Sequence, residues 1–251
     1  MSAFRDSTIV FRRQLRMNLR NPAWVIIGML QPVMYLLLFG PLLTPLVDRF
    51  GTDNAYTFFV PGMLVQLGIF GAFFAGFSLI GEWREGVIEA ERVTPASRTA
   101  LLFGRLYRDL LQLLVQSLIL VGLGFAMGMD ASPLGMLYGV FLTLLVGGAC
   151  AAASNALALT TKSEDVMAPV INMVMMPVLL LSGILLPMTI GPDWLQRASD
   201  FMPTRHVVDA VRGSFLCDFA ASSLLWGTLW TLVLFALALW WGTRTFRREN
   251  A

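Results

Sequence analysis

Residues 133–160 read PLGMLYGVFLTLLVGGACAAASNALALT, and this stretch contains no charged side chain. A helix that crosses about 30 Å of hydrocarbon needs about 20 mostly apolar residues, so this stretch is long enough. A short polar turn, residues 161–165, separates it from a second apolar stretch. Because lipid offers the backbone no hydrogen bonds, both stretches are predicted to cross a membrane as helices.

Six such stretches occur along the chain. Of its residues, 57% are hydrophobic and 14% are charged, whereas soluble domains carry about 25% charged residues. The stretches are residues 24–47, 56–81, 110–129, 133–160, 166–190 and 219–243. We therefore predict an all-α integral membrane protein, with six transmembrane helices in a single domain, residues 1–251.

The arginine and lysine residues predict how these helices are oriented. Fourteen of the eighteen lie before the first stretch, in the connections after the second and fourth, or after the sixth. In membrane proteins the cytoplasmic loops carry the excess of basic residues. Both ends of the chain are therefore predicted to lie in the cytoplasm.

The N-terminal segment, residues 1–22, is amphipathic at helical spacing. Five arginines crowd one face, and the apolar residues form an adjoining stripe: Phe4, Phe11, Leu15 and Leu19. This pattern is typical of a helix that lies in the headgroup plane of a membrane. A positively charged tail without fixed structure is the alternative.

Several classes of function lack the residues that they need. The only histidine is His206, which excludes a multi-histidine metal site, and no Gly-x-x-x-x-Gly-Lys phosphate loop occurs. No ionisable residue lies in the central part of a predicted span, where proton-coupled transporters carry their relay. The net charge of +2 does not suggest nucleic acid as a partner. We therefore expect no enzyme activity and no metal or cofactor site, and any transport must be powered by another chain.

Polar and methionine side chains inside the spans mark a candidate substrate path. Pro169 and Pro177 interrupt the fifth stretch, and methionine offers an adaptable apolar surface. Ordinary packing of a kinked helix is the alternative to a path. The candidate residues are Gln66, Asn155, Asn172, Met173 and Met176.

The connection between spans two and three, residues 82–109, carries an acidic face. On a helix, Glu82, Glu85 and Glu89 fall on one side. The pair of Glu85 and Glu89 is mildly unfavourable in isolation, and a basic partner surface would remove that penalty. A solvated helical hairpin with ordinary surface charge is the alternative.

The connection between spans five and six, residues 187–218, is too polar in its middle to span a membrane and too apolar for a free loop. Prolines divide it into short pieces. Two short helices, near 192–201 and 204–216, that dip back toward the outer leaflet would satisfy both facts.

These two connections carry a resemblance to a known family. The sequence is similar to the type-2 ABC-transporter permeases, especially the drug- and antibiotic-export branch that includes daunorubicin-resistance permeases. The residues that match at the end of span five and in the second connection are Ser182, Gly183, Pro187, Pro192, Trp194, Leu195, Pro203, Val208, Asp209, Ala210 and Arg212. The residues of the first that match are Glu82, Gly86, Glu89, Thr94, Pro95, Ser97 and Arg98.

The resemblance implies a permease that pairs with a separate ATP-binding subunit, normally with two copies of each and with ATP and Mg²⁺ on the partner. Residues 82–98 would form a coupling helix seated on that ATPase, with these residues as candidates: Glu82, Arg84, Glu85, Gly86, Glu89, Arg92, Thr94, Pro95 and Arg98. The second connection would form a re-entrant outer gate, with this signature: Gly183, Pro187, Pro192, Trp194, Pro203, Asp209 and Arg212.

The resemblance also implies export of a hydrophobic or amphipathic substrate, such as a drug, an antibiotic or a lipid, across the cytoplasmic membrane of a bacterium. Export of a polysaccharide or a lipid-linked glycan, as in another branch of the family, is one alternative. A membrane scaffold that transports nothing is another. The tryptophans and tyrosines lie mostly at span ends, as in interfacial belts, which favours the drug or lipid interpretation over the glycan.

Overall fold

The computed structural model describes residues 12, 15–16, 23–45, 54–88, 98–185, 187–216 and 222–249. All regular structure in these residues is helical. The helices are α2 (Ala23–Leu43), α3 (Ala55–Phe73), α4 (Ala75–Arg84), α6 (Arg98–Ala126), α7 (Pro133–Thr161), α8 (Glu164–Leu181), the 3-10 turn η2 (Met188–Ile190), α9 (Asp193–Asp200), α10 (Pro203–Phe215) and α11 (Ser222–Glu249).

Among the described residues, five helical stretches are long and apolar enough to cross a membrane. They are Ala55–Arg84, Leu101–Ala126, Pro133–Thr161, Glu164–Leu181 and Ser222–Arg248. Within α2 lies a shorter apolar stretch, Ile26–Leu42. The prediction of an all-α protein with long apolar helices is confirmed, and five of the six predicted spans have a counterpart of sufficient length.

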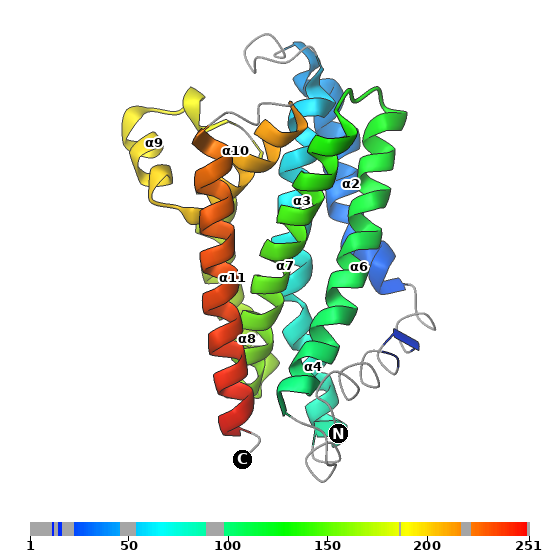
Figure 1. Cartoon of the computed structure of the whole chain (residues 1–251), viewed down its shortest axis with the longest axis vertical. Coiled ribbons are helices and arrows are strands. Elements are labelled where there is room, and N and C mark those ends of the chain that lie inside the picture. Colours follow the sequence, from blue (N-terminus) through cyan, green and yellow to red (C-terminus); the bar gives the residue numbers. More distant parts are fainter. Residues whose placement is uncertain are drawn as a thin grey trace.

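The helices run along one long axis and leave two distinct ends (Figure 1). The end of α4, the start of α6 and the end of α11 lie together at the bottom of the view, and we call this the α4 end. The short helices α9 and α10 lie at the top, at what we call the α10 end. The central helix is α3, in which every residue from Thr57 to Ile69 is buried. It packs against α2, α6, α7 and α10.

Local sequence sets several of the helix ends. Helix α3 begins after Asn54, whose side chain accepts a hydrogen bond from the Tyr56 backbone N–H, as an N-cap residue does. Helix α7 begins after Ser132, which caps Gly135 N–H in the same way. Its last residue is followed by Lys162, which has a φ of 52° in the left-handed region. This conformation turns the chain sharply into α8, as the short polar turn predicts.

Two predicted span boundaries are wrong. The fifth span was expected to continue to residue 190, but α8 ends at Leu181. Gly183 follows with a φ of 72°, a left-handed conformation that commonly ends helices. The third span was expected to begin at residue 110, but α6 begins at Arg98. Residues 98–109 of the predicted cytoplasmic connection are therefore the first three turns of that helix.

The remaining segments have different outcomes. The two short helices expected near 192–201 and 204–216 are confirmed as α9 and α10. The predicted interface helix, residues 1–22, lies outside the described residues apart from Arg12, Leu15 and Arg16, so it stays a prediction.

Candidate functional site

A buried ion pair joins α4 to α6 at the α4 end. Arg105 Nη2 donates a hydrogen bond to Glu82 Oε2 at 2.7 Å. Glu82 is 8% exposed and Arg105 is 1% exposed. A charge pair so deeply buried is strongly destabilising to break, because the partner left behind is an unpaired charge. Glu82 therefore fixes the end of α4 against the first turns of α6.

Two further ion pairs lie close to this one. On α6, Arg108 Nη2 lies 2.7 Å from Asp109 Oδ1, and Arg108 Nε donates to the same oxygen at 2.9 Å. At the surface, Arg84 Nη1 lies 3.0 Å from Glu164 Oε1, and both side chains are largely exposed. This pair links the last turn of α4 to the first turn of α8. Exposed pairs of this kind contribute little stability, about 0–1 kcal/mol, so the link can open readily.

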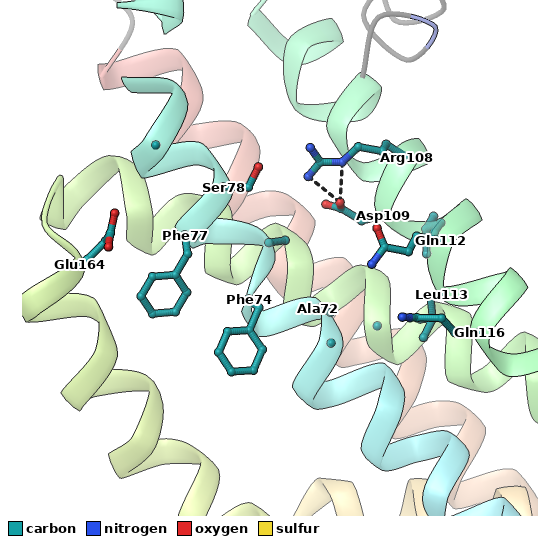
Figure 2. A pocket seen from close by; sticks show the side chains of 15 residues that line it. Ala72, Phe74, Phe77, Ser78, Arg108, Asp109, Gln112, Leu113, Gln116 and Glu164 are labelled. Atoms are coloured by element: carbon teal, nitrogen blue, oxygen red, sulfur yellow. Dashed lines mark hydrogen bonds and ion pairs between the residues drawn. The ribbon is translucent and has the colours of Figure 1, made fainter. Parts of the chain in front are cut away.

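A cavity of about 600 Å³ lies between α3, α4, α6, the middle of α7 and the start of α8. Figure 2 shows two groups of side chains around it. Arg108, Asp109, Gln112 and Gln116 gather on the α6 side, and the rings of Phe74 and Phe77 lie on the α8 side of the α3–α4 ribbon. The rest of the lining is mostly small or apolar: Gly71, Ala72, Ala75, Ser78, Gly81, Leu110, Leu113, Gly147 and Glu164.

A break in the long second span shapes this cavity. Helix α3 ends at Phe73 and α4 begins at Ala75, so the axis is interrupted at Phe74. Small residues lie near the break, among them Ala72 and Ala75, and a Cβ placed on Gly71 or Gly81 would meet nothing within 4 Å. The interrupted helix therefore leaves space beside α6 where a continuous helix with larger side chains would fill it.

The predicted coupling residues fall into three groups. Glu82 is buried against Arg105, so its carboxylate is not on an exposed acidic stripe with Glu85, which is a correction to that stripe. Glu85 is exposed at the C-cap of α4, and Gly86 follows with a φ of 75°. Arg84 is exposed and pairs with Glu164, and of Arg98 only the backbone at the start of α6 is described. The remaining members lie outside the described residues: Glu89, Arg92, Thr94 and Pro95.

Of the predicted outer signature, Arg212 is the residue that joins several elements. This side chain is buried, and its Nη2 donates to Ile184 O at 2.9 Å while Nε donates to Phe58 O at 3.3 Å. Its guanidinium carbon lies 3.9 Å from the centroid of the Phe58 ring. Burial lowers the pKa of Arg212 to about 10, which still leaves it charged at neutral pH. One cation therefore joins α10 to α3 and to the turn after α8.

The other signature residues shape the chain around this contact. Pro187 precedes η2, Pro192 precedes α9, and Pro203 is the first residue of α10, positions where the missing N–H of proline costs no helical hydrogen bond. Gly183 provides the turn in which Ile184 lies. Asp209 lies 3.6 Å from Arg205 on the same helix, and Trp194 is exposed on α9.

The predicted substrate-path residues do not come together. Gln66 is 1% exposed, and neither atom of its amide has a hydrogen-bond partner among the described residues. Asn155 is also buried, and its amide donates to Ala151 O on its own helix. The α8 residues Asn172, Met173 and Met176 face outward, with Met173 80% exposed. None of the five lines the cavity.

The polar wall of the cavity was absent from the predicted path. Its signal in the sequence is the recurrence of Arg108, Gln112 and Gln116 at four-residue steps, which places all three on one helix face. Two of them fall inside a predicted span, where side-chain amides are uncommon. The pairing of Glu82 with Arg105 had no comparable signal, because it depends on how α4 and α6 meet.

Comparisons with known proteins give a consistent result. The sequence model of the family described as ABC-2 type transporter matches residues 6–216. The ycf38 protein of Cyanophora paradoxa, named as a transport permease, is 30% identical over 198 residues, which cover 77% of this chain and 68% of that protein. The daunorubicin resistance ABC transporter permease protein DrrB1 of Streptomyces coeruleorubidus is 26% identical over 193 residues, which cover 76% of this chain and 68% of that protein. DrrC of Mycobacterium tuberculosis, named as a doxorubicin resistance ABC transporter permease, is 23% identical over 214 residues, which cover 84% and 77%.

Proposed function

The chain belongs to the ABC-2 type transporter family and is the transmembrane subunit of an ABC exporter, and on this premise we propose that its substrate is a hydrophobic or amphipathic molecule such as a drug, an antibiotic or a lipid. Two relatives are named for resistance to daunorubicin and doxorubicin, which supports a substrate of this kind. The mixed lining of the cavity, with amides and an ion pair on one side and phenyl rings on the other, supports it too.

The energy for export comes, in this proposal, from a separate ATPase that docks at the α4 end. The docking site is inferred from the different surroundings of Glu82 and Glu85. Glu82 is tied to Arg105 inside the bundle, and Glu85, three residues later, is exposed. No ion pair of Glu85 occurs among the described residues. A basic ATPase surface that binds Glu85 would therefore act on an element already fixed to the α6 wall of the cavity.

The same proposal includes six crossings with both chain ends in the cytoplasm, and two copies of the permease in the bacterial cytoplasmic membrane. Helix α2, with its shorter apolar stretch, would supply the sixth crossing. Basic residues at the α4 end support its cytoplasmic placement. They include Arg84, Arg105, Arg108, Lys162 and Arg244. The helices α9 and α10 would then form the re-entrant outer gate.

Glycan export is less well supported than export of a drug or a lipid. Sugar-binding conduits are commonly lined by tryptophan and tyrosine rings, because these combine an apolar face with a polar group. Among the described residues, those that line the cavity include no tryptophan or tyrosine, and the aromatic ones are Phe74 and Phe77. A scaffold that transports nothing would have no need for the cavity.

The test is a charge reversal at the proposed docking surface. Glu85→Arg should weaken binding of the ATPase about tenfold, equivalent to about 1.4 kcal/mol, because a favourable contact becomes a repulsion. Co-purification of the two subunits and substrate-stimulated ATP hydrolysis should fall together. The permease should still insert, since Glu85 lies outside the five apolar stretches.

Asp130→Arg is the matched control, because it makes the same charge change at an exposed position at the α10 end. It should leave the affinity for the ATPase unchanged. Equal losses in both variants, or no loss in Glu85→Arg, would remove Glu85 from the docking surface.

A further inference from the structure

We propose that the cavity beside α6 binds one amphipathic molecule whose polar head is uncharged or zwitterionic, and that it holds the head against α6 and the apolar body against Phe74 and Phe77. This inference rests on the proposed function, since it gives the exporter a binding site inside a single protomer. The two sources of such a molecule are an exported substrate and a resident membrane lipid, which share this chemistry.

The size and the lining of the cavity set the class of ligand. Its volume of about 600 Å³ falls within the roughly 300–1,000 Å³ that pockets for drug-sized molecules occupy. Such pockets are mostly apolar with a few convergent polar groups. Here most of the polar lining residues lie on α6, and Ser78 of α4 and Glu164 of α8 are the others among the described residues. A ligand that is polar throughout would leave the small and aromatic residues unmatched.

The ion pairs in and beside the cavity set the charge of the head. Three lining residues are charged: Arg108, Asp109 and Glu164. Arg108 pairs with Asp109, and Glu164 pairs with Arg84 at the edge. Each charge is thus already matched by an opposite one. A ligand with a net charge would find no unpaired opposite charge in this poorly solvated space, so its burial would cost free energy. A neutral head with donors and acceptors, or a zwitterion, avoids this cost.

The polar wall fixes where the head lies. Arg108, Gln112 and Gln116 recur at four-residue steps on α6, so they extend over about 12 Å of one helix face at 1.5 Å per residue. Side-chain amides offer both donors and acceptors. A head with several polar groups therefore has hydrogen-bonding partners along this whole length.

The aromatic side indicates how the ligand enters. Phe74 is 57% exposed at the α3–α4 break, and its ring centroid lies 5.8 Å from that of Phe77. Both residues lie in the apolar stretch Ala55–Arg84. In a single protomer, an exposed ring in a membrane-spanning segment would face lipid, and the apolar side of the cavity would then open sideways into the bilayer. A molecule with an apolar body can enter by that route without crossing water.

The experiment fills the cavity without disturbing its walls. Gly71→Leu places a side chain in the open space beside the helix, because a Cβ at Gly71 meets no atom within 4 Å. Gly81→Leu is a second variant of the same kind, also on the lining. Gly122→Leu is the matched control, since Gly122 has the same open surroundings on α6 but does not line the cavity.

The probe is a single-chain zwitterionic amphiphile that carries a dansyl group, titrated by fluorescence onto the full-length permease in nanodiscs. We expect saturable binding at one molecule per chain in the wild type and in Gly122→Leu. Binding should weaken at least tenfold in Gly71→Leu and Gly81→Leu. Cationic and anionic probes with the same chain should bind at least tenfold more weakly to the wild type. Unchanged binding in both cavity-filling variants would overturn the site, and equal binding of all three probes would overturn the assignment of head charge.

Two further measurements distinguish the sources of the ligand and keep the proposals separate. A resident lipid should co-purify with wild type and Gly122→Leu but not with Gly71→Leu, as measured by mass spectrometry. An exported substrate should instead stimulate ATP hydrolysis by the assembled transporter in the wild type and in Gly122→Leu, but not in Gly71→Leu. If Gly71→Leu and Gly81→Leu both bind the probe like wild type, the site is refuted. If the wild-type transporter still exports normally, the proposed function stands. Binding of the probe at the site in a wild-type chain that exports nothing when assembled with its ATPase would refute the function alone.

Discussion

Arg212 shows how a single residue can organise the α10 end. Its charge has no carboxylate within ion-pair distance among the described residues, and it is balanced by two backbone carbonyls and the face of Phe58. The carbonyl of Ile184 is exposed to it because the chain turns at Gly183. Gly62 completes the contact, since a Cβ there would approach Ile184 O to 2.6 Å. Three elements therefore meet at one guanidinium.

Replacing Arg212 with lysine tests this role at the residue scale. An ammonium keeps the charge but cannot donate to two carbonyls from a planar fork or stack on the ring in the same way. We expect Arg212→Lys to lower the free energy of unfolding by about 1–3 kcal/mol, because a buried acceptor loses its donor. The measurement is a thermal unfolding curve of the purified permease in detergent. Arg197→Lys, at an exposed position on α9, is the control and should leave the midpoint unchanged. Equal midpoints for the two variants would contradict the role of the guanidinium.

At the scale of elements, α10 is held by close approach to its neighbours. Gly135 of α7 lies against Ser214 O, and Gly227 of α11 lies against His206 O, both closer than a Cβ would permit. Val207, Val208 and Val211 of α10 are fully buried between these helices. A short helix with an apolar side gains most of its stability from such packing. The position of α10 therefore depends on small residues in helices that are distant in sequence.

The prediction at this scale is that Gly135→Ala displaces α10. The added methyl group meets a backbone oxygen, which cannot rotate away, so α10 has to shift. Overpacking of this kind costs about 1–3 kcal/mol. We expect a lower thermal midpoint and faster proteolysis between α9 and α11. Gly122→Ala adds the same methyl group in open space, and it should match or slightly exceed the wild type in stability. A Gly135→Ala protein as stable as Gly122→Ala would show that α10 is not seated there.

Elements with local signals were predictable from the sequence, and contacts between elements were not. Helices α9 and α10 follow from prolines and spaced apolar residues within one short segment. The start of α6 was misplaced because hydropathy counts Arg105, Arg108 and Asp109 as loop residues, whereas the structure places them in ion pairs on a helix. The end of α8 was misplaced because apolar residues continue past the turn at Gly183.

In the candidate site, too, individual residues were predictable from the sequence and their contacts were not. Family resemblance pointed to Glu82 and Arg212, but not to what they contact. Glu82 was expected on the surface, and only the packing of α4 against α6 buries it beside Arg105. The cavity depends on a helix break at Phe74 and on the absence of side chains at Gly71 and Gly81. The spacing of residues along one helix does not show how far apart two helices lie, so it could not predict this cavity.

At the scale of the whole molecule, the two ends differ in charge. The described basic residues at the α4 end include Lys162 and Arg244, and those at the α10 end are Arg197, Arg205 and Arg212. Arg205 and Arg212 are engaged within the α9–α10 region rather than displayed on its surface. The larger number of described basic residues thus lies at the α4 end. By the positive-inside rule, we expect this end to face the cytoplasm.

Thiol labelling tests that orientation directly. Because Cys150 and Cys217 are native thiols, the background protein carries Cys150→Ala and Cys217→Ser. Single cysteines are then placed at exposed positions at each end: Asp130 and Asp193 at the α10 end, and Asp165 at the α4 end. An impermeant maleimide added to intact cells should label Asp130→Cys and Asp193→Cys at once. Asp165→Cys should react only after the membrane is permeabilised, which also shows that its thiol is accessible. Labelling of Asp165→Cys in intact cells would invert the orientation, and the ATPase could then not reach Glu85 at all.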